Sequence, residues 1–328
     1  MQKHTLDTTD RIIPAMSGPA NPNMASGKAL GPHVSPTSAR SWDVICIGQT
    51  SLDTIHMDEG ECAQRVGGSA FIPANLMANL GLRVGLVSCW GTPLTQSTFA
   101  APNLDLTGVI RRPEPAVQIT LKYEKQNLCE LRVSDRITRF LTESQIPRNY
   151  YQAKFFYLTP TPAALLCDVA NEAFAKGARV VFTPKEDFPS VGKSRTMQRL
   201  LAKCFMCFVN ERELDRLTGA TGVSGISILH SLGVSIVVAT FGAQGAVIAT
   251  PQVSWKVAPS AISKAKDVVG AGDCFAAGML AALSRDVDLR RASAFAGELT
   301  AWWLANRIER EAEVLERFAS ELTRFRSN

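Results

Sequence analysis

Residues 267–278 read Asp-Val-Val-Gly-Ala-Gly-Asp-Cys-Phe-Ala-Ala-Gly, and the interpretation of the whole chain starts from this stretch. A Gly-Ala-Gly turn runs directly into an apolar segment with the composition of a buried helix. Such a turn presents unpaired backbone N–H groups at the positive end of the helix dipole, and only small residues let phosphate oxygens approach them. Asp273 stands beside the turn, where a carboxylate can accept a proton from an attacking hydroxyl. Taken alone, Asp273 is equally explained as an ordinary helix cap.

Short apolar runs and helical patterns alternate along the rest of the chain. Runs with the length of buried strands occupy residues 44–47, 84–89, 155–158, 179–182, 205–209 and 236–240. Between several of them, apolar residues recur at helical spacing, at residues 70–80, 163–176 and 225–232. Strands that alternate with helices predict an α/β fold with right-handed crossovers and a mainly parallel sheet covered on both faces.

Two segments do not follow this alternation of buried strands and helices. Residues 117–123 and 128–133 alternate apolar and polar side chains around Glu124-Lys125-Gln126-Asn127. This pattern is typical of a hairpin with one face exposed to water. We expect a small β lid at the edge of the main sheet, with strands at about 54–66 and 116–134.

The beginning of the chain differs from the remainder in amino-acid composition. Residues 1–41 contain five prolines among Ser, Gly, Asn and Thr, with few apolar residues at helical or strand spacing. Such a segment cannot bury enough apolar surface to fold, so we expect a disordered N-terminal tail. Residues 42–328 are expected to form one folded domain.

Composition argues against several classes of partner. The 35 Lys and Arg residues against 30 Asp and Glu leave a formal charge of +5, and no run of five like charges marks a nucleic-acid arm. Apolar stretches are interrupted well before the ~20 residues that a membrane span needs. Without a signal-peptide pattern, we expect a cytoplasmic protein whose eight cysteines are reduced. Cys204 and Cys207 lie in an apolar strand, whose alternation predicts opposite faces and no shared metal or disulfide.

The stretch at 267–278 resembles the second signature of the ribokinase or PfkB family of carbohydrate kinases, which runs Asp-Thr-x-Gly-Ala-Gly-Asp-x-Phe-x-x-Gly. Val268 replaces the usual Thr, and the resemblance extends over about residues 43–307. It implies a ribokinase-like three-layer sandwich with a small β lid. It also implies an ATP-dependent kinase that transfers the γ-phosphoryl group to a hydroxyl of a sugar or sugar derivative, with Asp273 as the base. The anion hole is then formed by Gly270, Ala271 and Gly272.

Two more motifs resemble the nucleotide side of this family. Asn210-Glu211-Arg212-Glu213 resembles its Asn-x-x-Glu motif, in which Asn210 and Glu213 would organise Mg²⁺, largely through water. The same residues are equally explained as a capping box with Asn210 as the N-cap, and both interpretations can hold. Residues 237–246 resemble a segment that approaches the nucleotide phosphates, although a tight turn also explains its glycines. By this resemblance the nucleotide is contacted by Thr240, Gly242 and Gly245.

The acceptor side follows the family pattern less closely. The sequence Gly48-Gln49-Thr50-Ser51-Leu52-Asp53 resembles Gly-x-x-x-x-Asp, in which the carboxylate accepts hydrogen bonds from two acceptor hydroxyls. Residues 67–81 resemble the first signature, but Ile72 stands where most members have a sugar-binding Asn. That contact is lost, or Ser69 or Asn75 takes it over. Thr183 also stands where members commonly have an acidic residue. The acceptor-binding residues implied by the resemblance are Asp53, Gly67, Gly68 and Ser69.

Three readings of the function stay open. A sugar kinase fits Asp53 and the glycine pair at 67–68. A nucleoside kinase of the same family fits Phe71 and Ile72, if an apolar base replaces part of the polyol contact. A sensor that binds ATP or a sugar without turnover fits the altered acceptor motifs. The intact glycine turn with Asp273 argues against the sensor.

The resemblance implies further ligands and contacts. ATP and Mg²⁺ are the expected cofactors, with a monovalent cation near Asp267. Residues 292–304 form an apolar helix whose Trp302 and Trp303 would help to wall the adenine pocket, although a core helix explains them as well. Family members often pair through the lid, which implies a homodimer.

Overall fold

The computed structural model describes residues 41–56, 62–95, 101, 103–124, 127–134, 141–185, 190–259, 268–306 and 311–324. Two expectations lie outside these ranges, namely the disordered tail, apart from its last residue, and the cation near Asp267.

The described strands of the main sheet number nine and follow the order β13-β12-β11-β10-β9-β8-β1-β4-β5. From β5 to β11 all neighbours are parallel, while β12 and β13 add an antiparallel edge. The mainly parallel sheet predicted from the sequence is therefore confirmed. The strands are β1 (Trp42–Ile47), β4 (Val84–Thr92), β5 (Leu104–Pro115), β8 (Ala153–Leu158), β9 (Arg179–Phe182), β10 (Cys204–Asn210), β11 (Ile236–Thr240), β12 (Ala246–Ala249) and β13 (Ser254–Val257).

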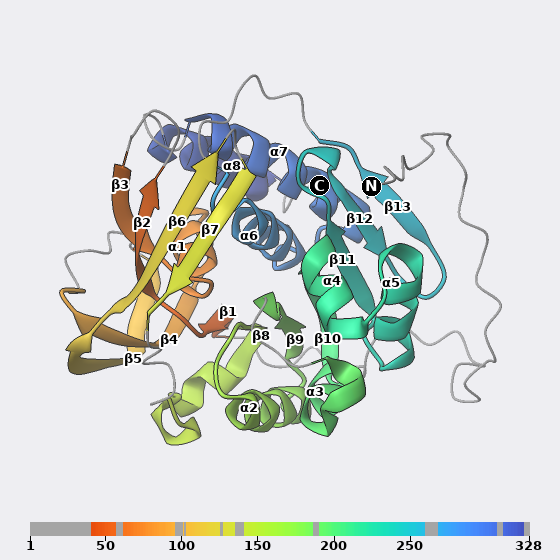
Figure 1. Cartoon of the computed structure of the whole chain (residues 1–328), viewed down its shortest axis with the longest axis horizontal. Coiled ribbons are helices and arrows are strands. Elements are labelled where there is room, and N and C mark those ends of the chain that lie inside the picture. The colour runs from red at the N-terminus through yellow and green to blue at the C-terminus, as the bar shows by residue number, and fades with distance from the viewer. Residues whose placement is uncertain are drawn as a thin grey trace.

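Helices cover both faces of this sheet and complete a three-layer sandwich (Figure 1). Alternate residues of β1 divide between the layers, because Val44 and Cys46 belong to one apolar cluster and Ile45 and Ile47 to the other. The first face carries α1 (Phe71–Asn79), α6 (Ala271–Leu283), α7 (Leu289–Asn306) and α8 (Glu311–Arg324). The second carries α2 (Ala163–Ala175), α3 (Arg195–Leu201), α4 (Glu211–Thr218) and α5 (Gly222–Ser231).

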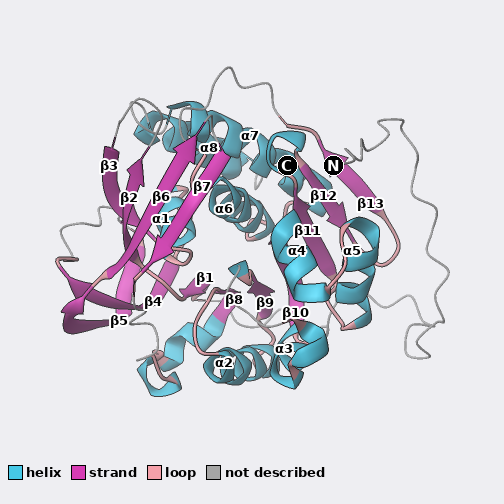
Figure 2. Cartoon of the chain, viewed as in Figure 1, coloured by secondary structure: helices cyan, strands magenta, loops and turns pink. Residues whose placement is uncertain are grey.

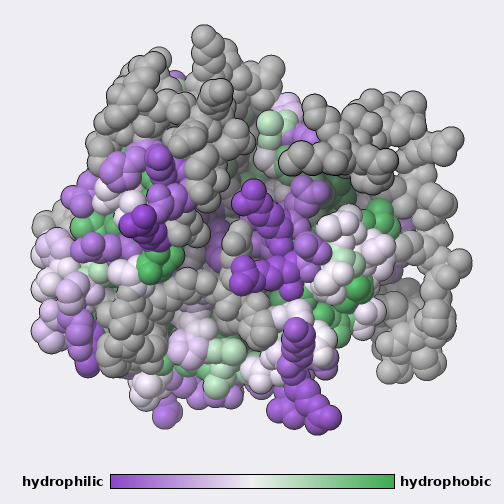
Figure 3. Space-filling model, in the orientation of Figure 1, coloured by the Kyte–Doolittle hydropathy of each residue, from purple (hydrophilic) through white to green (hydrophobic). Residues whose placement is uncertain are grey.

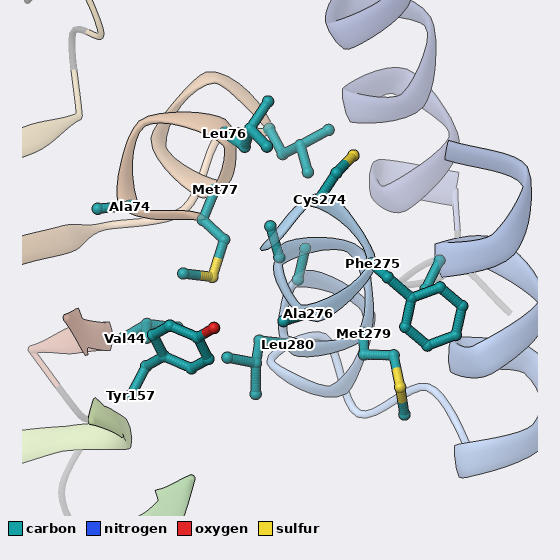
Figure 4. Packing of buried hydrophobic residues seen from close by; sticks show 14 of the residues in the cluster. Val44, Ala74, Leu76, Met77, Tyr157, Cys274, Phe275, Ala276, Met279 and Leu280 are labelled. Atoms are coloured by element: carbon teal, nitrogen blue, oxygen red, sulfur yellow. The ribbon is translucent and has the colours of Figure 1, made fainter. Parts of the chain in front are cut away.

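Helix α6 is the most deeply embedded helix of the first face. Every residue from Asp273 to Leu283 is buried. Figure 4 shows Val44 and Tyr157, from β1 and β8, lying against Leu280 of this helix. Helix α6 therefore has a fixed position above the centre of the sheet.

A second, smaller sheet stands apart from the main one (Figure 2). Its order is β3 (Cys62–Gly67), β2 (Ser51–His56), β6 (Val117–Glu124), β7 (Asn127–Val133). The pairs β2–β3 and β6–β7 are antiparallel, and β2–β6 is parallel. Strands β2 and β6 continue from the carboxyl ends of β1 and β5, so the small sheet stands at that edge of the main sheet.

Sequence analysis does not predict β5, which pairs with β4 at the edge of the main sheet. Pro113 and Pro115 interrupt its apolar pattern. An edge strand tolerates proline because one side of it has no ladder to donate to. The periodicity that identifies a central strand is therefore missing here.

The prediction that Cys204 and Cys207 face opposite ways is wrong. Both side chains belong to the same apolar cluster. The pairing of β10 with β9 shifts register between Cys204 and Met206, and such a bulge resets the alternation of a strand. The two thiols are nevertheless free, and burial raises the pKa of each. Nowhere in the described ranges do three or more His, Cys, Asp or Glu side chains form a possible metal-binding group.

A few large hydrophobic side chains are exposed among the described residues. The large hydrophobic side chains exposed in the described part of the chain are Phe174, Val223, Val253 and Trp302. On the face seen in Figure 3, hydrophobic surface forms small patches among hydrophilic residues. None of the helices with described positions has the length and hydropathy needed to cross a bilayer.

A buried carboxylate ties three elements together at the amino end of the sheet. Asp43 is 3% exposed and accepts a hydrogen bond from the Arg83 backbone N–H at 3.0 Å. Its second oxygen lies 3.1 Å from Lys154 Nζ, which also donates to the Ser284 carbonyl at 2.6 Å. Asp43 thereby links β1 and β8 to the end of α6.

We predict that Asp43→Ala lowers the free energy of unfolding by about 1–3 kcal/mol, because a part-buried ammonium loses its charged partner. Urea denaturation followed by circular dichroism measures the change. The control is Glu172→Ala, which removes an exposed ion pair with Lys176 at 3.6 Å and should cost less than about 0.5 kcal/mol. Equal effects of the two substitutions would contradict the importance of Asp43.

Candidate active site

The carboxyl ends of the parallel strands gather at one edge of the sheet. Gly48 follows β1 and Thr159 follows β8, and a Cβ added to Gly48 would lie 1.8 Å from Thr159 Oγ1. Later strands of the chain lie on both sides of β1, with β4 and β5 on one side and β8 to β13 on the other. The strand order therefore reverses between β1 and β8. Open α/β sheets bind ligands at such a switch point, outside the carboxyl ends of the strands.

The glycine turn of the opening stretch forms the start of α6. Gly270 is the N-cap and has a φ of 83°, in the left-handed region that glycine adopts without strain. Asp273 is the third residue of the helix and is 7% exposed, so it is not the N-cap residue. No described atom lies within 4 Å of a Cβ added to Gly272, so this side of the turn faces open space. The Ala271 N–H donates to the Val268 carbonyl at 3.2 Å, and the remaining N–H groups of the first turn share one helix mouth with the Asp273 carboxylate.

A lysine that sequence reasoning left without a role contacts this carboxylate. Lys185 Nζ lies 2.9 Å from Asp273 Oδ1, and the two side chains are 29% and 10% exposed. Lys185 stands three residues after the end of β9, at the edge where ligands bind, which is the signal that could have identified it. Its φ is 49°, in the left-handed region that is unfavourable for a residue with a side chain.

Thr183, the neutral replacement for an acidic residue, has a local partner of its own. Thr183 is 3% exposed, and its hydroxyl lies near Tyr157, where it acts to lower the pKa of the phenol. Burial raises the pKa of Tyr157 far above its usual range, and the negative charge of Asp273 adds to this. Tyr157 therefore stays a neutral phenol beneath α6, and Thr183 contributes no charge to the site.

The acceptor residues predicted on the small sheet lie close together. Asp53 on β2 is 3% exposed and accepts a hydrogen bond from Ser51 Oγ at 2.6 Å. A Cβ added to Gly67 would lie 1.8 Å from Asp53 Oδ2, so only glycine leaves room for this carboxylate. Arg65 is the residue directly opposite Asp53 in the pairing of β2 with β3, which places a cation on the same face.

The segment between β1 and β2 is held by buried hydrogen bonds. Thr50 Oγ1 lies 2.9 Å from Ser88 Oγ and accepts from Trp90 Nε1 at 3.2 Å. Ser88 Oγ also donates to the Gly48 carbonyl at 2.8 Å. This network fixes the start of β2 to β4, so the position of Asp53 is set from the main sheet.

Ile72 connects the acceptor side to the glycine turn. Its backbone N–H donates to the Gly68 carbonyl at 3.0 Å, and its Cδ1 would lie 3.4 Å from a Cβ added to Gly270. Gly68 in turn packs against the backbone of Gln49, and the half-buried Ser69 follows it. The isoleucine that replaces the usual Asn is therefore an apolar wall beside the turn.

The two tryptophans of α7 have different surroundings. Trp303 is 2% exposed, and its Cη2 would lie 3.3 Å from a Cβ added to Gly270. Trp302 is 46% exposed and is covered by the Arg317 guanidinium, 4.4 Å from its ring centroid. Only Trp303 lies next to the glycine turn.

The predicted nucleotide and metal residues lie on neighbouring strand ends. Asn210 Oδ1 accepts from the Glu213 N–H at 2.8 Å, and Glu213 Oε2 accepts from the Asn210 N–H at 2.9 Å, so the capping box is confirmed. Thr240 is the register partner of Asn210. Gly242 has a φ of 56° and nothing described within 4 Å of an added Cβ, whereas Gly245 packs against the Val257 carbonyl.

The capping box remains compatible with Mg²⁺. An amide oxygen and a carboxylate are hard ligands with more than one lone pair each, and Mg²⁺ retains most of its waters. Asn210 and Glu213 therefore fit a role as holders of a hydrated ion.

Comparisons with known proteins identify the family of the chain. Residues 42–307 match the model of the pfkB family carbohydrate kinase. The chain is 30% identical to a cytidine kinase of Thermococcus kodakarensis, over 74% of this chain and 89% of that protein. It is 29% identical to an ATP-dependent ribose-1-phosphate kinase of Halopiger xanaduensis, over 86% of this chain and 96% of the relative.

The structural comparison concerns the fold. The structure of Arabidopsis thaliana ribokinase complexed with ribose and ATP superposes with a TM-score of 0.70 at 17% identity, over 86% of this chain and 98% of that one. The predicted ribokinase-like fold is thereby confirmed. Together with the family match, these findings show that the chain belongs to the pfkB family of carbohydrate kinases and is a phosphotransferase that acts on a hydroxyl group.

Proposed function

We propose that this kinase phosphorylates a hydroxyl of a ribose-containing acceptor. Cytidine and ribose 1-phosphate, named for the two relatives, both contain a ribose unit. Asp53 supports the proposal, because one carboxylate can accept hydrogen bonds from two neighbouring ribose hydroxyls. Gly67 leaves the room that this carboxylate needs.

Asp273 is proposed as the base of an in-line transfer. The acceptor oxygen attacks the γ-phosphorus, its proton passes to the Asp273 carboxylate, and the bond to the β,γ-bridging oxygen breaks as ADP leaves. The turn at 270–272 and the helix dipole stabilise charge on the phosphoryl oxygens, with the Ala271 N–H also donating to the Val268 carbonyl. Mg²⁺, when bound, would neutralise the nucleotide phosphates, with Asn210 and Glu213 holding its waters.

The observation that carries this proposal is the continuity between the two halves of the site. Asp53 abuts Gly67, and the next residue, Gly68, is hydrogen-bonded to Ile72, which lies against Gly270 at the mouth of α6. A small acceptor held by Asp53 can therefore reach the helix mouth that carries Asp273. Thr240 and Gly242 are the proposed nucleotide contacts on the far side, and Gly245 shapes the turn between them and β12.

A nucleoside is the first acceptor to test, and a free sugar is the second. The relative with 30% identity is a cytidine kinase, and Ile72 offers an apolar surface rather than a further polar contact. A coupled assay for ADP with cytidine, other nucleosides, ribose and ribose 1-phosphate decides between them. Silence with every acceptor would favour the sensor reading.

Several features around the catalytic domain are also proposals. Residues 1–41 are proposed to be a tail on a kinase domain of residues 42–328, and the small sheet is proposed as a lid that excludes water from the reaction. A monovalent cation near Asp267 is proposed by resemblance to the family, and a cytoplasmic location is proposed from the sequence pattern. Pairing of two chains through the small sheet is testable by light scattering.

We predict that Asp273→Asn lowers kcat by roughly 10² to 10⁴, the range usual for loss of a general base. The amide keeps the shape of the side chain, so the dissociation constant of ATP should stay within about twofold. Steady-state kinetics and calorimetric titration with ATP measure the two quantities. Near-normal turnover of this variant would show that another group takes the proton.

We predict that Asp53→Ala lowers kcat/KM for the acceptor by about 10- to 100-fold, because hydrogen bonds to a charged group are lost. The affinity for ATP should not change, since the nucleotide lies on the other side of the transferred group. Asp168→Ala, an exposed substitution on α2, is the control and should leave both quantities unchanged. A loss of ATP affinity alone, with kcat/KM for the acceptor unchanged, would show that Asp53 belongs to the nucleotide half of the site.

A further inference from the structure

We infer that Lys185 is a second catalytic residue, whose ammonium pairs with Asp273 before the reaction and contacts the phosphoryl group during transfer. The inference rests on the proposed reaction and adds a positively charged side chain, which neither the glycine turn nor the capping box supplies. Its first support is the 2.9 Å contact between Lys185 Nζ and Asp273 Oδ1.

The position of the base fixes the position of the ammonium relative to the phosphate. A base must lie within about 3 Å of the acceptor oxygen, and that oxygen lies about 3–3.5 Å from the phosphorus before attack. An ammonium in contact with the base is therefore within reach of the equatorial phosphoryl oxygens after a small rotation of its four-carbon stem.

The backbone of Lys185 gives independent support. Its φ of 49° lies in the left-handed region, where a residue with a Cβ is strained. Among the described residues, only Asp286 is a second non-glycine residue with positive φ. Strained backbone persists where the surrounding structure enforces it, and it is concentrated at functional sites. Here the strained residue is the one whose side chain reaches the proposed base.

During the proposed reaction the negative charge next to Lys185 moves from the Asp273 carboxylate to the phosphoryl oxygens and ADP, and a flexible cation can follow it. Before transfer, the ammonium stabilises the ionised carboxylate of Asp273. When the acceptor hydroxyl gives its proton to Asp273, the carboxylate becomes neutral and the ion pair ceases to exist. At the same moment the new O–P bond forms, the bond to the bridging oxygen breaks, and the negative charge lies on the phosphoryl oxygens and ADP. Lys185 keeps its own proton throughout and exchanges one anionic partner for another.

A merely positioning role is the competing explanation. Lys185 could act only through Asp273, by holding its carboxylate in one orientation. Thr183 does not share this role, because its side chain lies near Tyr157 and carries no charge. The two explanations predict different results in the Asp273→Asn background. A residue that only orients the base has no effect on phosphoryl binding once the base is replaced, whereas a residue that contacts the phosphoryl group still has one.

The experiment compares Lys185→Met, Lys185→Arg, Asp273→Asn and the double variant Lys185→Met with Asp273→Asn. The acceptor is cytidine or ribose 1-phosphate, whichever the wild type phosphorylates. We expect Lys185→Met to lower kcat by roughly 10² to 10³, as for other groups that stabilise transition-state charge, with the acceptor KM within about threefold. Lys185→Arg should recover part of the rate, because it keeps the cation. Lys193→Met, at an exposed lysine, is the control and should be unchanged.

The decisive measurement is binding of Mg²⁺, ADP and aluminium fluoride together with the acceptor, a mimic of the transferring phosphoryl group. We expect Lys185→Met to weaken this complex by at least tenfold in the Asp273→Asn background, while ADP alone binds as before. Thermal denaturation checks that each variant is folded. An unchanged mimic affinity in that background, or wild-type kcat in Lys185→Met, would overturn the inference and leave the proposed function standing. If the wild type phosphorylates none of the acceptors tested, the proposed function itself fails, and this inference with it.

Discussion

The arrangement of this protein depends on how firmly α6 is embedded in the first helical layer. Its residues from Asp273 onward are buried against the sheet and the neighbouring helices, so the helix cannot slide or rotate without breaking the core. The first turn, with its N–H groups and its carboxylate, is therefore held at the carboxyl edge of the sheet. The amino end of the sheet is fixed separately by Asp43 and Lys154. The core thus defines where charge can be stabilised before any ligand binds.

Much of the fold could be predicted because its signals are local. The run at 179–182 becomes β9 and that at 236–240 becomes β11, since a buried parallel strand needs continuous apolar residues. Where a different rule applied, the prediction failed. Strand β5 carries prolines that an edge strand accepts, and the bulge in β10 reverses the facing of a cysteine. Neither an edge position nor a bulge is visible in the order of residues alone.

The residues of the candidate site likewise fall into those whose geometry the sequence predicts and those whose contacts it does not. The turn at 270–272 and the box of Asn210 and Glu213 are each continuous in sequence, so their local geometry could be predicted. The ion pair of Lys185 with Asp273 joins residues 88 positions apart and follows only from the tertiary fold, which brings the segment after β9 next to the start of α6. The contact of Ile72 with Gly270 is of the same kind. Long-range contacts between single residues leave no pattern in a sequence.

The connection between the two sheets has a mechanical consequence. The small sheet joins the main one through residues 48–50 and through Ala116, and both junctions are anchored, the second by an Ala116 N–H bond to the Thr92 carbonyl at 2.9 Å. A hinge movement about these junctions would carry Asp53 with the small sheet while Asp273 stays with the core. The carboxylate proposed to bind the acceptor and the carboxylate proposed to deprotonate it thus belong to different sheets or layers of the protein. Movement of the small sheet toward the core would change the distance between Asp53 and Asp273. Only an acceptor of matching length would then contact both carboxylates.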